Sequence, residues 1–123
     1  MPIYREKENK LNLTVSDSDN IVSIEIECQN GTIASAAFTS NAAVNVTCGN
    51  SATVSTASNL KDDYDIFSCI ASNPNGDEIK VVHTIKEANG QEIKYTFPDD
   101  YTGSTPYNTT DLTPSYEFTV NFN

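Results

Sequence analysis

The chain has 123 residues, a length that fits one domain, and a formal net charge of −10 at pH 7. Nucleic acids and anionic membranes are recognised mainly through Lys and Arg, so this charge argues against both as partners. One His, one Arg and no Trp leave little material for catalysis, whereas 14 Asn, 14 Thr and 12 Ser suit a domain of many strands and turns.

The N-terminal residues 1–9 are predicted to form a polar arm in front of a domain that spans residues 10–123. The arm is charged and lacks the apolar segment of a secretory signal, so we expect assembly in a cytoplasm. A signal peptide removed upstream of Met1 would instead predict a secreted or cell-surface protein.

The first half of the domain predicts several short strands. Leu11, Leu13 and Val15 alternate with polar residues. Within residues 22–28, polar residues alternate with Val22, Ile24, Ile26 and Cys28, which are predicted to point inward. Asn30-Gly31 predicts a tight hairpin that leads into a third strand over residues 32–39.

In the middle of the chain the alternation of apolar and polar residues is less regular. Residues 44–48 and 52–56 predict a fourth and a marginal fifth strand, and residues 59–65 have room for at most a short helical turn. The apolar run 66–71 predicts a short strand that is covered on both faces.

Residues 77–97 carry the clearest pattern. Ile79, Val81, His83 and Ile85 alternate with residues that are polar except for Val82, and Ile93, Tyr95 and Phe97 alternate with polar residues after Asn89-Gly90. Period-two arms joined by Asn-Gly predict an antiparallel hairpin with a type I′ turn.

The C-terminal part combines a long polar loop, residues 98–114, with a last strand over residues 115–123. An apolar strand that runs to the final residue is suited to pair with the sheet edge of a neighbouring subunit. The residues predicted to contact a subunit or partner are Tyr101, Tyr107, Tyr116, Phe118, Val120 and Phe122.

Together these elements predict an all-β, single-domain antiparallel β-sandwich of seven or eight strands. Turns that recur every eight to twelve residues are typical of an immunoglobulin-like or jelly-roll architecture.

The reactive side chains predict no catalytic site and no cofactor. Cys28, Cys48 and Cys69 lie about twenty residues apart without a Cys-x-x-Cys pair, so we expect reduced core thiols, with a Cys28–Cys69 disulfide as the alternative. His83 is expected to be a packed, hydrogen-bonded residue and not a base for Cys69.

The carboxylates form three clusters in the sequence. Calcium prefers six to eight oxygen ligands, which loops at one end of a sandwich could pool. No cluster has the spacing of a calcium loop, so we interpret them as turn-forming and solvated, and we predict no metal site. The clusters are Asp17, Asp19 and Asn20; Asp62, Asp63 and Asp65; Asp99 and Asp100.

The predicted function is that of a non-enzymatic structural protein, a small virion component such as a phage head-decoration or tail protein that forms homo-oligomers or joins a larger assembly. One alternative is an extracellular adhesion or glycan- or protein-binding module, assisted by calcium. A second alternative is an acidic inhibitor that occupies the basic groove of a host protein.

Overall fold

The computed structural model describes residues 2–8, 11–16, 21–39, 43–46, 60–73, 76 and 78–123. Within these residues all regular structure is β, arranged in two sheets, which confirms the predicted all-β sandwich. No helix in the described part of the chain has the length and apolar character that a membrane span requires.

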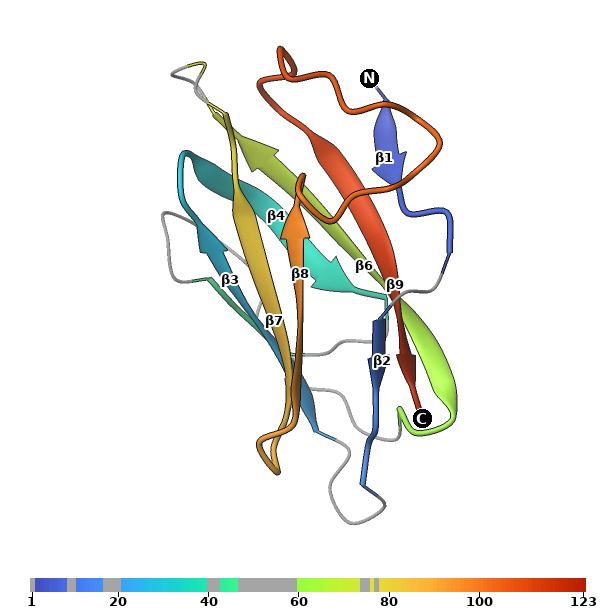
Figure 1. Cartoon of the computed structure of the whole chain (residues 1–123). Coiled ribbons are helices and arrows are strands. Elements are labelled where there is room, and N and C mark those ends of the chain that lie inside the picture. Colours follow the sequence, from blue (N-terminus) through green and yellow to red (C-terminus); the bar gives the residue numbers. More distant parts are fainter. Residues whose placement is uncertain are drawn as a thin grey trace.

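One sheet has five strands, and the C-terminal strand lies in its middle. β9 pairs in antiparallel fashion with β6, which pairs with β4, while β1 and β2 both run parallel to β9 along its other edge (Figure 1). The strands are β1 (Ile3–Arg5), β2 (Leu11–Leu13), β4 (Thr32–Phe38), β6 (Asp63–Ser72) and β9 (Ser115–Phe122).

The second sheet has four strands in the order β5-β3-β7-β8. β3 pairs in antiparallel fashion with β7 and in parallel with β5, and β7 and β8 form a hairpin. The strands are β3 (Val22–Cys28), β5 (Ala43–Val46), β7 (Val81–Glu87) and β8 (Glu92–Phe97).

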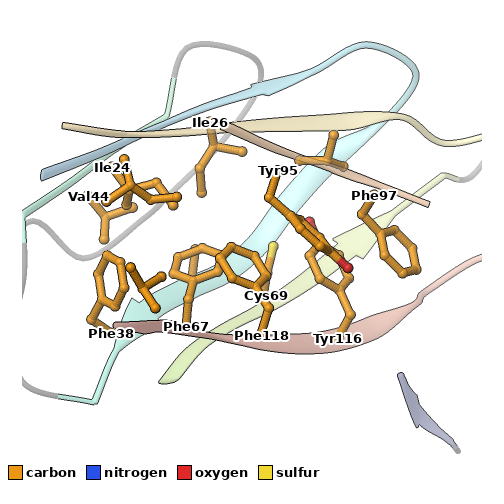
Figure 2. Close-up of a cluster of buried hydrophobic side chains, with 14 of the residues drawn as sticks. Ile24, Ile26, Phe38, Val44, Phe67, Cys69, Tyr95, Phe97, Tyr116 and Phe118 are labelled. Atoms are coloured by element: carbon orange, nitrogen blue, oxygen red, sulfur yellow. The ribbon is translucent and has the colours of Figure 1, made fainter. Parts of the chain in front are cut away.

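The core lies between the two sheets and is filled from both. Figure 2 shows Phe67, Phe118 and Tyr116 of the five-stranded sheet facing Ile26, Tyr95 and Phe97 of the four-stranded sheet. Tyr116 stacks on Phe97 with ring centroids 4.1 Å apart, and Phe118 stacks on Tyr95 at 4.3 Å. Aromatic pairs of this kind contribute beyond the area that they bury.

The hairpin predicted at residues 77–97 is confirmed as β7–β8, but its turn type was wrong. Gly90 has φ +97°, whereas Asn89 does not have the positive φ that a type I′ turn requires at that position. Gly90 N–H donates to Glu87 O at 3.0 Å and Glu87 N–H donates to Gln91 O at 2.9 Å. The loop therefore contains three residues and ends in a left-handed glycine.

The hairpin predicted at Asn30-Gly31 was also wrong, because this turn carries the chain from one sheet to the other. β3 and β4 belong to different sheets, and Gln29 N–H donates to Lys80 O instead of to a β4 residue. Gly31 has φ +149°, and a Cβ there would lie 2.3 Å from the carbonyl oxygen of Ser72. The glycine thus permits the chain to pass close to the end of β6 as it enters β4.

A bulge settles which residues of β4 face the core. Strict alternation would put Ile33 and Phe38 on opposite faces of β4. The pairing with β6 shifts by one residue between Ile33 and Ser35, however, so Ile33, Ala36 and Phe38 are all buried on the same face.

The segment predicted as a polar arm, residues 1–9, contains a short strand that the sequence did not indicate. Ile3–Arg5 form β1 beside β9, and the Tyr4 side chain is fully buried. The buried Tyr4 side chain anchors this short strand in the sheet. This contact is long-range, so the local sequence pattern does not predict it.

The layer crossing at Gly31 predicts a specific cost for an added methyl group. We expect Gly31→Ala to lower the free energy of unfolding by about 2 kcal/mol or more, because it combines an unfavourable φ with a clash against backbone. Gly76→Ala is the matched control: φ is +75° but nothing lies within 4 Å, so we expect only about 1 kcal/mol. Urea denaturation of both variants measures the difference, and equal losses would contradict the role of the crossing.

Candidate functional site

Four of the six residues predicted to contact a partner lie inside the sandwich. Tyr116, Phe118, Val120 and Phe122 point inward from β9, and none is more than 2% exposed. Both edges of β9 are also paired, to β6 on one side and to β1 and β2 on the other. The C-terminal strand is therefore not a free edge: its apolar face packs against its own domain.

The other two predicted contact residues, Tyr101 and Tyr107, are half-buried around Tyr4. Both rings meet the Tyr4 ring edge-on, with centroids 5.7 and 5.2 Å away. The Tyr4 hydroxyl donates to Asp111 Oδ2 at 3.0 Å. These tyrosines thus close one end of the core and anchor the long loop.

Glu6 fastens the same loop to the N-terminal segment. Its Oε1 accepts hydrogen bonds from the Tyr95 hydroxyl at 2.6 Å and from the Thr102 backbone N–H at 3.0 Å, and the Thr102 hydroxyl donates to Oε2 at 3.1 Å. Burial, followed by the neighbouring Glu6, raises the pKa of Tyr95 far above its usual value. The loop is a packed part of the domain in this structure.

His83, the one histidine, lies fully buried between the sheets, as the sequence predicted. Its Nδ1 is 2.9 Å from the carbonyl oxygen of Tyr95 and its Nε2 is 2.9 Å from the Tyr116 hydroxyl. Because a carbonyl only accepts, Nδ1 carries the proton and donates, which leaves Nε2 to accept from Tyr116. Both nitrogens of a neutral imidazole are thereby satisfied.

The Tyr116 hydroxyl also hydrogen-bonds the thiol of Cys69. A series of hydrogen bonds therefore connects Cys69, Tyr116, His83 and the Tyr95 carbonyl. Burial raises the pKa of Cys69 to about 12 and lowers the pKa of His83 to about 4. Near neutral pH, this arrangement holds a protonated thiol and a neutral imidazole with Tyr116 between them, and it does not generate a thiolate.

The buried imidazole predicts a loss of stability on acidification. The pKa of His83 is lower in the folded protein than the usual 6.5, so the unfolded chain binds the extra proton first, and stability falls as pH drops from 6.5 toward 4. Between about pH 7 and pH 5 we expect His83 to account for about 2 kcal/mol of this loss. Urea denaturation at both pH values should show a correspondingly smaller loss for His83→Gln, and an equal loss would contradict the assignment.

The two described cysteines, Cys28 and Cys69, are buried free thiols, which confirms the predicted core role for these two. Cys48 lies outside the described residues. We expect iodoacetamide to leave Cys28 and Cys69 unmodified in the folded protein and to alkylate both in urea, with peptide mass mapping as the readout. Rapid labelling of either residue under native conditions would contradict their burial.

The two acidic clusters that the structure describes do not meet at one end of the sandwich. Asp62 and Asp63 lie at the start of β6, whereas Asp99 and Asp100 follow Phe97, which stacks on Tyr116. Tyr116 pairs with Cys69, six residues or about 20 Å along β6 from Asp63. The cluster Asp17, Asp19 and Asn20 lies outside the described residues.

The carboxylates around residue 99 are engaged in local contacts. Asp99 pairs with Lys80 at 3.0 Å, and Asp100 accepts the Thr96 backbone N–H at 2.7 Å. They line a cleft of about 380 Å³ beside Tyr95. Among the described residues no group of three or more His, Cys, Asp and Glu side chains is placed to hold a metal ion.

Two buried carboxylates were not recognised from the sequence. Asp65 is 2% exposed and accepts the Thr39 hydroxyl and the Ile66 backbone N–H, so it links β6 to the end of β4 and is not solvated as expected. Glu87 is also 2% exposed, and its Oε1 accepts the Ser16 backbone N–H at 2.5 Å. The sequence did contain a signal for Glu87: it continues the inward series of residues 81, 83 and 85, and this alternation predicts a buried side chain.

The outer faces of the two sheets differ in charge. On the four-stranded sheet, five of the nine outward positions of β3, β7 and β8 are charged, and Lys86 pairs with Glu25 at 3.0 Å. These positions are Ser23, Glu25, Glu27, Val82, Thr84, Lys86, Glu92, Lys94 and Thr96.

The outer face of the five-stranded sheet is neutral among its described residues. Its two charged side chains, Arg5 and Glu117, pair with each other at 2.6 Å. We call this surface the neutral face. It comprises Ile3, Arg5, Asn12, Thr32, Ser35, Ala37, Tyr64, Ile66, Ser68, Ile70, Ser72, Ser115, Glu117, Thr119 and Asn121.

The neutral face also exposes apolar side chains. Tyr64 is 62% exposed, Ile70 41% and Ile3 39%. The sequence predicted that the strand over residues 66–71 is covered on both faces, but the structure covers only its inner side. The outward half of this apolar run is therefore partly open to solvent.

No family model matches this chain, and searches of curated proteins and of solved structures find no significant match.

Proposed function

We propose that this protein is a non-enzymatic structural subunit, a small virion component of the kind that decorates a phage head or builds a tail, and that it acts through contacts between subunits. The observation that carries the proposal is the neutral face. In a chain of net charge −10, this sheet surface has no unpaired charge at its described positions and exposes Tyr64 and Ile70.

Charge explains why such a face favours assembly. Copies that each carry −10 repel one another, and a contact that brings carboxylates together adds a desolvation cost. A surface of Ser, Thr, Ala, Ile and Tyr side chains lets another protein approach without either penalty. The charged face of the four-stranded sheet keeps the opposite side in solvent.

The core supports a role without chemistry. Both ring nitrogens of His83 are engaged in hydrogen bonds, and its partner Tyr116 is also hydrogen-bonded to Cys69. A proton donor or nucleophile has to reach its substrate, whereas these side chains are sealed between the sheets.

The proposal predicts association that strengthens with salt. We expect the purified chain to form oligomers from micromolar to millimolar concentration in multi-angle light scattering, and added NaCl to favour them by screening repulsion between acidic copies. An inhibitor that binds a basic groove would show the opposite: a monomer alone, and a complex with a basic protein that dissociates in salt. A chain that stays monomeric throughout would contradict the proposal.

A further inference from the structure

Large and small side chains alternate in one row across the neutral face. Four neighbouring strands contribute Ile3, Ser115, Ile70 and Ser35, which are aligned by the pairing of β1 with β9, of β9 with β6 and of β6 with β4. All four point outward, because each flanks a buried residue of its own strand.

This alternation shapes the surface. Neighbouring strands lie about 4.8 Å apart, so the two isoleucines stand about 10 Å from each other with Ser115 between them. A serine side chain ends well short of an isoleucine, so the surface is lower over Ser115 than over the isoleucine on either side, and we call this step the Ser115 hollow. Each isoleucine is roughly two-fifths exposed and forms a ridge beside the hollow.

We propose that the row is a self-complementary interface at which a second copy of this chain docks, with Ile70 of each copy in the Ser115 hollow of the other. A ridge and a hollow that adjoin on one surface are brought together by a two-fold rotation, which pairs the same residues in both directions. The inference rests on the proposed function and specifies the subunit contact that it requires.

The surrounding charges favour a second copy as the occupant. The next row across the sheet contains Arg5 and Glu117, already paired with each other, followed by Ser68 and Ala37. Two copies can therefore meet here without bringing the unpaired carboxylates of either chain into the contact. A basic partner would find no free acidic group among these residues and would be drawn to other surfaces.

The test compares Ile70→Glu with Val82→Glu in sedimentation velocity and light scattering of the full chain. Both variants add one negative charge at an outward strand position, but Val82 lies on the charged face. We expect Ile70→Glu to raise the dissociation constant of the dimer by about tenfold or more, because it places a charge in an apolar contact. Val82→Glu should leave the dissociation constant unchanged.

A third variant separates shape from charge. Ser115→Trp fills the hollow and leaves the net charge as it is, so it should weaken the dimer to a similar degree. Circular dichroism and thermal melting verify that each variant is folded. If the wild type associates and both Ile70→Glu and Ser115→Trp associate equally well, this interface is wrong while the proposed function stands. If the wild type is monomeric at every concentration, both fail.

Discussion

The structure depends on the central position of β9, the C-terminal strand. Its inner side chains Tyr116, Phe118, Val120 and Phe122 form a large part of the core, and its edges hold β6, β1 and β2. Each of these side chains removes a large apolar area from water, and this area offsets the conformational entropy lost when the chain orders. Without β9 the five-stranded sheet would lose the strand that joins its two halves.

A chain of buried hydrogen bonds sets how the two sheets face each other. His83 in β7 and the Tyr95 carbonyl in β8 belong to the four-stranded sheet, while Tyr116 in β9 and Cys69 in β6 belong to the other. An apolar core alone tolerates small sliding movements, but an unsatisfied buried polar group costs free energy. The hydrogen bonds therefore favour one register between the layers.

The inner side chains of both sheets are buried in the core, so the outer faces of the sheets, and not the inner ones, can contact another protein. The inner faces of the two sheets are similar in chemistry, whereas the outer faces differ: one has Lys or Glu at five of the nine outward positions of β3, β7 and β8, and the other contains mainly Ser, Thr, Ala and Ile around a single ion pair. A large negative net charge keeps such a protein soluble and resists unspecific association. The proposed function places specific association where charge is lacking.

The sequence by itself determined the all-β class, most strand positions and the inward side of β3, β7, β8 and β9, because alternation with period two is a local property of the chain. It also predicted a buried, hydrogen-bonded His83. Only the tertiary structure decided which sheet each strand joins, that Asn30-Gly31 crosses between layers, and that the apolar face of β9 packs inside its own domain. An alternating apolar face has the same pattern in either setting, so partner, register and sheet order follow from long-range contacts such as Tyr4 with the 98–114 loop and Ser115 with Ile70.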